Sequence, residues 1–526
     1  MHRLVKIFLV VLVPQIFLAI LIYNFQNLPN YNNLSELKDQ FSESRISMVD
    51  HSNFSELKKD FKNAHEITAA CLSCHINRGD ELLKSPHFNW EREMYIEGRG
   101  VVYSGKKNGL NNFCTGIAGS EATCNRCHAG YGYSDKNYDF SNPYNIDCMV
   151  CHDNSRIYKK ASGGAGYPDP SLTKEDYRKI FAHLGTPTKH NCGECHFHSA
   201  GGNNIKHGQL ETALLNCTKE VDVHMSKEGG NLECIDCHVT KNHVMKGRYY
   251  GISSENYNRA SCEDCHTKFP HKKDLINEHT LKVSCQVCHI PIYAKVNATK
   301  LYWDWSTACN LKDGNPYFET DEDGNETFLS EKGNFVWQKN VVPEYVWFNG
   351  TADHHFLTDS IKSIPVKINS LNGNYSDYSS KIWPVKVHRG KQPYDTKYNR
   401  IVQPKLWDAE KGRGGLWVDY NWDSALVKGM EYLNLPYSGE HGFVETEMYL
   451  PLNHMVSPGK QALSCNDCHT RTNSRLAGLT DFYMPGRDRN IYLDWFGLSI
   501  VIMTILGVAG HAAMRYIAAR KIKSQH

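Results

Sequence analysis

Cysteine and histidine recur in one short pattern along this 526-residue chain. Sixteen of its nineteen cysteines fall into eight copies of C-x-x-C-H, numbered here as motifs one to eight in chain order. Two thiols at this spacing can form thioethers with the vinyl groups of one haem, and the adjoining histidine then lies beneath the iron as an axial ligand. The pattern therefore predicts eight covalent haems as cofactors. The predicted attachment cysteines are Cys71, Cys74, Cys124, Cys127, Cys148, Cys151, Cys192, Cys195, Cys234, Cys237, Cys262, Cys265, Cys285, Cys288, Cys465 and Cys468. The predicted proximal ligands are His75, His128, His152, His196, His238, His266, His289 and His469.

Two other uses of paired cysteines fit this pattern poorly. Structural zinc also takes C-x-x-C, but it needs paired knuckles and no histidine directly after every second cysteine. A disulfide framework would not repeat with this regularity. Since covalent haem attachment takes place outside the cytoplasm, we expect the body of the protein on the periplasmic, extracytoplasmic side.

A low-spin haem needs a second axial ligand, which is most often another histidine. The motifs use eight of the 27 histidines, so nineteen are left for this role. His279 lies six residues before the seventh motif, and His224 and His454 lie ten and eleven residues before the fifth and eighth. His243 and His271 come just after motifs. These five are candidate distal ligands, although the sequence does not say which iron each one binds.

The composition agrees with a core that haem helps to fill. Hydrophobic residues make up 40% of the chain, and the mean hydropathy is −0.53. The formal net charge is +2, and no basic tail suggests binding to nucleic acid. No C-x-x-C-K motif occurs, which argues against the pentahaem nitrite reductases. We expect a mainly α and irregular multihaem cytochrome c fold, organised by eight covalent haems, with a single C-terminal transmembrane helix.

Both ends of the chain carry apolar segments. Basic residues precede the apolar stretch 7–23, which predicts a secretory signal or an uncleaved anchor. Residues 495–514 carry no charge and are long enough to cross a bilayer, and the basic residues that follow predict a cytoplasmic C-terminus. A buried core helix is the alternative for this second segment. We therefore predict a protein of the cell membrane with one or two spans.

Seven zones are expected between and including these ends. Seven of the motifs lie at intervals of 23 to 53 residues, so neighbouring haems must approach one another closely. Eight of the ten tryptophans lie in a stretch without any motif, for which we expect a protein-cored lobe of mixed short strands and helices. The predicted zones are a signal or anchor (1–23), a polar linker (24–64), a haem-dense domain (65–300), a haem-free Trp-rich lobe (301–445), the eighth-haem segment (446–489), a transmembrane helix (490–515) and a basic cytoplasmic tail (516–526).

Longer stretches carry a more specific likeness. The chain resembles the octahaem tetrathionate reductase family of c-type cytochromes over nearly all of its soluble part. The matching stretches are NNFCT (111–115), NIDCMVCHD (145–153), NCGECHF (191–197), GGNNIKHGQL (201–210), VDVHM (221–225), CQVCHIP (285–291), TKLYWDWS (299–306), SKIWPVKVHRGKQPYD (380–395) and LPLNHMVSPGKQALSCNDCH (450–469). Much of 380–395 and 450–469 contains no general haem signal, which makes the resemblance specific.

The resemblance implies seven haems with two histidine ligands and one haem with a lysine. It assigns the second motif to that haem, with His128 as the proximal ligand, Lys206 as the distal ligand and Cys114 close to the iron. It also implies eight candidate distal histidines for seven places, so at least one is wrong. These are His87, His207, His224, His243, His271, His279, His388 and His454.

The chemistry of these residues fits a substrate site. A neutral lysine is a more easily displaced iron ligand than imidazole, and its pKa must fall before it can bind. The thiol of Cys114 belongs to no motif and, as a thiolate, could open a sulfur–sulfur bond by exchange. An inert buried thiol is the alternative for Cys114, and a surface or propionate contact is the alternative for Lys206. Asn203 stands where the family often has an acidic residue, HSAGG (198–202) interrupts a glycine run, and the C-terminal span differs from soluble members.

Three functions remain open at this point. The first is a terminal reductase of tetrathionate, or of nitrite or hydroxylamine, in which electrons cross the haem array to the lysine-ligated haem. The second is an electron conduit between a membrane quinol oxidase and periplasmic cytochromes, and the third is an oxidase of the hydroxylamine type. The expected partners are a small anionic substrate and a quinol-oxidising or b-type cytochrome in the membrane. His511, inside the predicted span, is a functional candidate because polar side chains are costly there, with a lipid-interface position as the alternative.

Overall fold

The computed structural model describes residue 15, residues 49–248 and residues 253–523. The predicted signal or anchor, 1–23, lies outside these residues except at position 15. The described chain falls into two compact units that divide after Ala462. The first unit holds seven motifs and the Trp-rich lobe, and the second holds the eighth motif and the C-terminal helix.

Most of the motifs lie on single helical turns, and motifs one and four lie on the longer helices α3 (Ala64–Cys74) and α9 (Lys189–His196). In motifs five, six and eight, the residue before the first cysteine and the aspartate before the second cysteine form a reciprocal capping box. The turn places cysteines three residues apart on the same side of the helix, as attachment to one haem requires. These capping pairs are Glu233 with Asp236, Ser261 with Asp264, and Ser464 with Asp467.

Short elements make up the haem-dense part. Its helices are η1 (His51–Asn53), η2 (Ser55–Leu57), α3 (Ala64–Cys74), α4 (Arg78–Leu83), α5 (Pro86–Asn89), α6 (Glu121–Cys124), η3 (Asn125–Cys127), η4 (Pro143–Asn145), α7 (Met149–His152), α8 (Lys174–Ala182), α9 (Lys189–His196), η5 (Ser199–Gly201), η6 (Thr212–Asn216), α10 (Cys234–Cys237), η8 (Cys262–Asp264), α11 (Asp274–His279) and α12 (Cys285–His289). Two hairpins accompany them, β1 (Arg92–Ile96) with β2 (Gly100–Ser104) and β3 (Thr240–Lys241) with β4 (Val244–Met245). The elements η1 and η2 lie within the segment predicted as a polar linker.

The lobe is built on a nine-stranded sheet, which extends further than short mixed strands would suggest. Its main path runs β11-β15-β13-β5-β8-β7-β6, and β9 and β14 also pair with β13. The strands are β5 (Thr299–Asp304), β6 (Phe318–Thr320), β7 (Glu326–Leu329), β8 (Gly333–Gln338), β9 (Glu344–Phe348), β11 (Val366–Lys367), β13 (Lys381–Asp395), β14 (Arg400–Ile401) and β15 (His441–Pro451). A separate pair joins β10 (Ala352–His354) to β12 (Asn369–Leu371). Strands β5 and β15 run across the predicted boundaries at 300/301 and 445/446.

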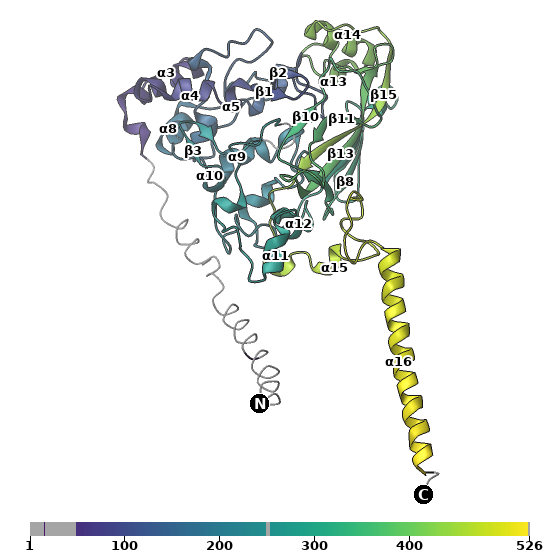
Figure 1. Ribbon diagram of the computed structural model, residues 1–526. Coiled ribbons are helices and arrows are strands. Elements are labelled where there is room, and N and C mark those ends of the chain that lie inside the picture. Colours follow the sequence, from purple (N-terminus) through teal and green to yellow (C-terminus); the bar gives the residue numbers. More distant parts are fainter. Residues whose placement is uncertain (1–14, 16–48, 249–252, 524–526) are drawn as a thin grey trace. The chain divides into compact units, whose positions relative to one another are not determined.

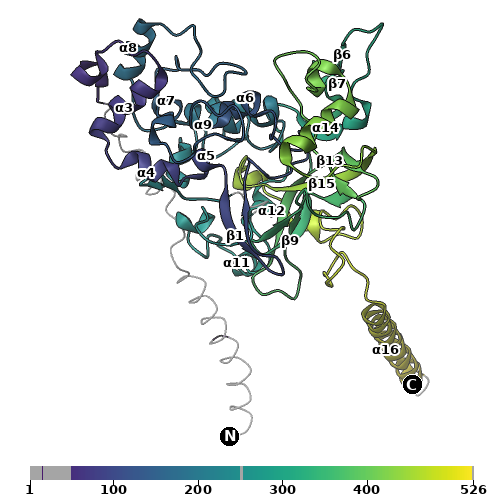
Figure 2. The ribbon, with the colours of Figure 1, turned by 90° about the horizontal axis from the view of Figure 1, so that it is seen from above.

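Aromatic side chains and one helix fill the core of the lobe. Trp303 and Trp305 are almost fully buried and stack with ring centroids 4.7 Å apart. Helix α14 (Trp422–Leu433) packs Ala425 and Met430 into the interior, and the short α13 (Leu416–Asp419) precedes it. The helices of the haem-dense part gather beside the sheet (Figures 1 and 2), and Tyr432 of α14 donates a hydrogen bond to Glu121 of α6 at 2.8 Å, so α14 also contacts this part.

Strand β13 is the long central strand, and it faces the haem-dense part with alternate residues. It pairs antiparallel with β15 along eleven residues and parallel with β5. Lys386 and His388 are two residues apart, so they lie on the same face of the sheet. Both are fully buried. This face meets the segments that carry Cys114 and Lys206.

The second unit contains α15 (Cys465–Cys468), which carries the eighth motif, and α16 (Ile491–Lys523). Residues Ile491–Arg520 of α16 have a mean hydropathy of 1.9 and are long and apolar enough to cross a membrane. The described side chains of α16 are exposed to the surroundings. The helix therefore agrees with the predicted C-terminal span and continues beyond its predicted end at residue 515.

Candidate functional site

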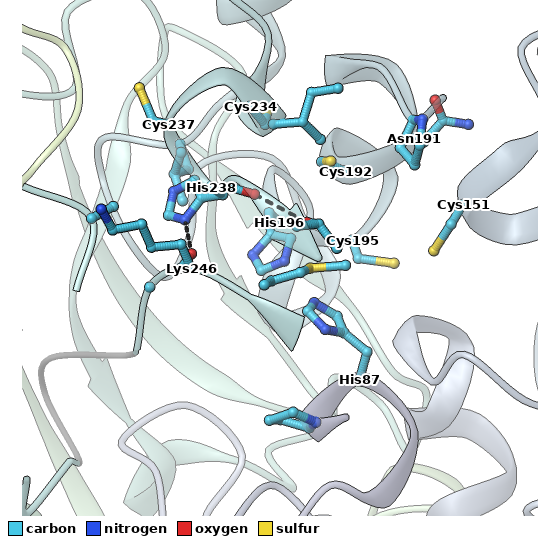
Figure 3. Close-up of a pocket in the computed structure, with 18 of the residues that line it drawn as sticks. His87, Cys151, Asn191, Cys192, Cys195, His196, Cys234, Cys237, His238 and Lys246 are labelled. Carbon is cyan, nitrogen blue, oxygen red and sulfur yellow. Dashed lines mark hydrogen bonds between the residues drawn. The ribbon is translucent and has the colours of Figure 1, made fainter. Parts of the chain in front are cut away.

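A cavity of about 2750 Å³ runs through the haem-dense part of the first unit. Each of motifs one to seven places at least one cysteine on its wall. Figure 3 shows motifs four and five at this wall, with His87 directed toward His196. The cavity is continuous and is lined by paired thiols and neighbouring imidazoles. These features fit a row of covalently attached haems.

Six motif histidines line this cavity, and each of them lies opposite a second imidazole. Imidazoles that bind opposite faces of one iron, with bonds of about 2 Å, have ring centroids about 6 Å apart. The observed separations are 6.1 to 6.4 Å. The pairs are His75 with His51, His152 with His243, His196 with His87, His238 with His454, His266 with His224, and His289 with His271.

Hydrogen bonds orient some of these imidazoles, and burial keeps some of them neutral, as binding to iron requires. Nδ1 of His152 is 2.9 Å from the carbonyl oxygen of Gly185. Nδ1 of His238 is 2.9 Å from the carbonyl oxygen of Lys246, and Figure 3 draws this second bond as a dashed line. Such bonds leave Nε2 for the metal and fix the orientation of the ring. Burial lowers the pKa of His196 to about 3, so this imidazole stays neutral, as a ligand must.

The predicted distal histidines divide into two groups. His87, His224, His243, His271 and His454 lie opposite motif histidines, which agrees with their predicted role. His388 packs instead against Phe113, with ring centroids 4.2 Å apart, and its backbone oxygen accepts a hydrogen bond from Asn112. His207 is half-buried beside Lys206, and desolvation lowers its pKa, while His279 is exposed at the end of α11. The roles of His207, His279 and His388 stay predictions.

His51 is the ligand candidate that sequence reasoning missed. It lies on η1, where Asp50 caps the turn, and its Nδ1 is 2.8 Å from the carbonyl oxygen of Val49. Its imidazole therefore directs Nε2 toward His75. A lone histidine in a polar segment outside the haem zone gives no sequence signal for this role.

The backbone around Lys206 is held by β5 and β13. The Lys386 ammonium donates to the carbonyl oxygen of Ile205 at 2.7 Å, and the Thr299 hydroxyl donates to that of Asn204 at 2.6 Å. Burial lowers the pKa of Lys206 to about 8, and the charge of Lys106 contributes to the shift. The amine of Lys206 can thus lose its proton near physiological pH, as ligation demands. Its side chain lines the same cavity as the second motif.

Cys114 also lines this cavity, and its backbone N–H donates to Asn111 Oδ1 at 2.9 Å. Its charge influences that of Cys124 in the second motif, which places the two close together. Burial raises the pKa of Cys114, and the charges of Lys332, Lys300 and Lys106 oppose this rise. The thiol form therefore dominates at neutral pH, and the lysines increase the small thiolate fraction.

The three lysines around Cys114 rest on aromatic rings. The Nζ atoms lie 4.1 Å from the ring centroid of Trp90 for Lys106, 3.1 Å from that of Phe335 for Lys300, and 5.4 Å from that of Trp417 for Lys332. Within the described ranges none of the three forms an ion pair with a carboxylate. Cations that lack a counter-ion beside a cavity make it attractive to anions.

Two other predicted site residues lie differently from expectation. His128 does not line the cavity: its ring packs 4.9 Å from that of Trp90 and 5.0 Å from that of Phe88, and its Nε2 is hydrogen-bonded to the Phe88 carbonyl. Its role as proximal ligand stays a prediction and requires the ring to turn. Asn203 Oδ1 accepts a hydrogen bond from the backbone of Thr212 at 2.9 Å, so its amide organises the loop next to Lys206.

Contacts between cysteines show which attachment sites are neighbours. The fourth motif lies next to the second, third and fifth motifs, so three other attachment sites meet at it. The side chains lie close together in four pairs, Cys71 with Cys148, Cys127 with Cys195, Cys192 with Cys234, and Cys262 with Cys285. Electrostatic contacts further link Cys151 with Cys192 and Cys237 with Cys265.

The eighth motif is organised in the same way within the second unit. The capping box of Ser464 and Asp467 forms its turn, and Nδ1 of His469 is 2.7 Å from the carbonyl oxygen of Pro485. This bond leaves Nε2 of His469 for a metal, as in the other motifs.

Known proteins share both the sequence and the structure of this chain. A family model described as bacterial cytochrome c matches residues 300–472. The octaheme cytochrome c from Shewanella oneidensis, known from its crystal structure, is 40% identical with a TM-score of 0.76, covering 84% of this chain and 98% of its own. An uncharacterized protein of Archaeoglobus fulgidus is 24% identical over 245 residues, which are 38% of this chain and 80% of that protein.

Proposed function

This chain belongs to the family of octahaem c-type cytochromes, and we propose that it is the terminal reductase of a small sulfur or nitrogen oxyanion, with tetrathionate as the leading substrate. It is a multihaem electron-transfer cytochrome with covalently bound haem c. In the proposal each of the eight motifs carries one haem, and Lys206 is the replaceable sixth ligand at the second motif.

One observation carries the proposal: half-buried Lys206 and the free thiol of Cys114 line the same cavity as the second motif. Three further lysines lie near this thiol, Lys106, Lys300 and Lys332, and among the described residues none of them forms an ion pair with a carboxylate. The lowered pKa of Lys206 supports ligation by a neutral amine that a substrate can displace. The lysine charges near Cys114 favour an anion. The six close histidine pairs support saturated irons at motifs one and three to seven, so within the first unit chemistry is expected at the second motif.

The order of neighbouring motifs supports a route for electrons. Motifs one, three, four, five, six and seven follow one another through cysteine contacts, and the second motif joins this row at the fourth. Because the second motif lies on a side branch, a haem there can accept electrons from the fourth motif while electron transfer continues along the other motifs. The bound haems supply one-electron transfer along this route.

The thiol of Cys114 gives a balanced route for tetrathionate. Its thiolate attacks the central sulfur–sulfur bond and releases one thiosulfate, which leaves a cysteine-bound thiosulfonate. Two electrons from the array then break the new sulfur–sulfur bond, restore the thiolate and release the second thiosulfate. The net reaction takes two electrons and no proton, whereas the reductions of nitrite and hydroxylamine consume protons.

The membrane connection is also part of the proposal. Helix α16 is long and apolar enough to cross a bilayer, and the eighth motif precedes it in the same unit. This arrangement supports delivery of electrons by a quinol-oxidising or b-type cytochrome partner, with the haem domain on the periplasmic side. His511 on this helix is proposed to contact the partner or the lipid interface.

The experiment is turnover of purified protein with a reduced dye on tetrathionate, nitrite and hydroxylamine, with Lys206→Ala and Cys114→Ser variants. Lys206→Ala should remove one distinct low-spin signal in electron paramagnetic resonance and leave the bis-histidine signals intact. Cys114→Ser should depress tetrathionate turnover far more than hydroxylamine turnover. An unchanged spectrum or equal losses would contradict this site, and no turnover of any substrate would favour an electron conduit.

A further inference from the structure

A buried ion pair lies between the second and third motifs. Lys160 Nζ is 3.2 Å from Asp147 Oδ2, and the side chains are 2% and 0% exposed. Such a pair is costly to bury, because both charges lose their water, and it persists only when further hydrogen bonds satisfy them. Both Lys160 and Asp147 form further hydrogen bonds. Those of Lys160 include one to the second motif, and those of Asp147 include one to the start of the third.

Lys160 is bound to the end of the second motif. Its ammonium donates to the carbonyl oxygens of His128 and Gly130, the latter at 3.1 Å. His128 closes the second motif, so a positive charge sits directly against that attachment segment. The charge of Lys160 also acts on Cys127 of the same motif, whereas at Cys151 of the third motif the influence of Asp147 exceeds that of Lys160.

Asp147 is bound to the start of the third motif. It immediately precedes Cys148, and its carboxylate accepts hydrogen bonds from the hydroxyls of Tyr131 at 3.1 Å and Tyr158 at 2.8 Å and from the N–H of Val150 at 3.2 Å. The charge of Asp147 acts on both Cys148 and Cys151. A negative charge therefore sits against the third attachment segment.

We propose that the Lys160–Asp147 pair sets a potential difference between these two sites and thereby directs electrons toward the second motif. Reduction adds an electron to a haem iron, so a nearby cation raises the reduction potential and a nearby anion lowers it. Because both charges are buried, water and salt screen them little. The haem on Cys148 and Cys151 becomes the better donor, and the haem on Cys124 and Cys127 the better acceptor. The inference deepens the proposed function but concerns potentials rather than turnover.

The two single substitutions should shift potentials in opposite directions. Lys160→Met leaves the Asp147 charge uncompensated, so the potential of the second-motif haem should fall. Asp147→Asn leaves Lys160 uncompensated, so both potentials should rise, and most at the third motif. We expect about a tenfold change in the electron-transfer equilibrium constant, which is about 59 mV for one electron.

Potentiometric titration followed by electron paramagnetic resonance measures these shifts in the full chain with its haems attached. The second-motif signal is identified by its loss on substitution of Lys206 or His128, and the third-motif signal by its change in a His243→Met variant. Lys159→Met is the matched control, because this neighbouring lysine is 56% exposed in its pair with Asp169 and should leave the potentials unchanged.

Unpaired buried charges can also prevent folding, so the neutral double variant Lys160→Met/Asp147→Asn is included. It should fold and bring the two potentials closer together than in the wild type. Shifts of the same sign in both single variants, or an unchanged potential difference in the double variant, would overturn the proposal. If the reduction potentials shift in opposite directions in the two single variants but the protein does not turn over tetrathionate, the ion-pair proposal is supported and tetrathionate is ruled out as the substrate.

Discussion

Replacing Lys300 by methionine tests whether buried charge near Cys114 selects anions. Lys300 is 3% exposed, and burial lowers its pKa from 10.5 to about 7. The charge of Lys332 adds to this shift, whereas Cys114 and Glu326 oppose it. Since one pKa unit corresponds to 1.36 kcal/mol, enclosing the ammonium costs about 5 kcal/mol relative to water. Lys300 is therefore cationic at pH 6 and neutral at pH 9.

The loss of activity should scale with substrate charge. At about 10 Å and an effective dielectric constant of about 20, one unit charge is worth about 1.7 kcal/mol. At pH 6, Lys300→Met should then lower kcat/KM roughly tenfold or more for nitrite and by about the square of that factor for tetrathionate. Hydroxylamine carries no negative charge at this pH, so it should lose no activity. At pH 9 the variant and the wild type should agree, because Lys300 has lost its charge.

The same substitution changes the pH dependence of stability. The unfolded chain keeps the Lys300 proton up to pH 10.5, whereas the folded chain releases it near pH 7. The unfolded state thus binds more protons in this window, and wild-type stability rises with pH relative to Lys300→Met. The gain between pH 7 and 9 should be about 2 kcal/mol, measured as a relative increase in thermal midpoint by calorimetry.

Lys312→Met is the control, because Lys312 is exposed and belongs to the same lobe. It should change neither the kinetics nor the pH dependence of stability. Equal losses on all three substrates would refute the electrostatic argument, as would a loss that persists unchanged at pH 9.

Three further predictions use other parts of the molecule. His51→Met should remove one bis-histidine signal in electron paramagnetic resonance and leave the haem on His75 with altered ligation; an unchanged spectrum would contradict this pairing. Lys386→Met should free the Ile205 carbonyl, and the Lys206-dependent signal should broaden or disappear while total haem content, measured by the pyridine haemochrome, stays constant. Deleting 490–526 should release a protein that accepts electrons from soluble dyes but not from quinol in native membranes; normal reduction by quinol would place the electron port elsewhere.

Features formed by residues that are neighbours in the sequence could be predicted from the sequence alone. The eight motifs and the apolar C-terminal segment are local features, so neighbouring residues were enough to predict them. The family resemblance also held, since a solved octahaem cytochrome matches most of the chain.

Partners distant in sequence could not be predicted in this way. His454 follows the long lobe yet lies opposite His238, and His51 precedes the haem zone yet lies opposite His75. Nothing near either residue encodes this pairing, because it depends on how separate segments pack. The placement of His388 against Phe113 likewise follows from the register of β13, which only the assembled sheet fixes.

The pairing of His238 with His454 has a consequence for biogenesis. The fifth motif lies more than two hundred residues before its facing imidazole, and β15 lies in between. In the proposed periplasmic location, the haem on Cys234 and Cys237 could be attached before His454 has crossed the membrane. Until then its iron has an open coordination position, which in a haem protein favours peroxide chemistry. A chain truncated before residue 454 should therefore show more peroxidase activity than the full chain, because the iron facing His238 lacks its second imidazole.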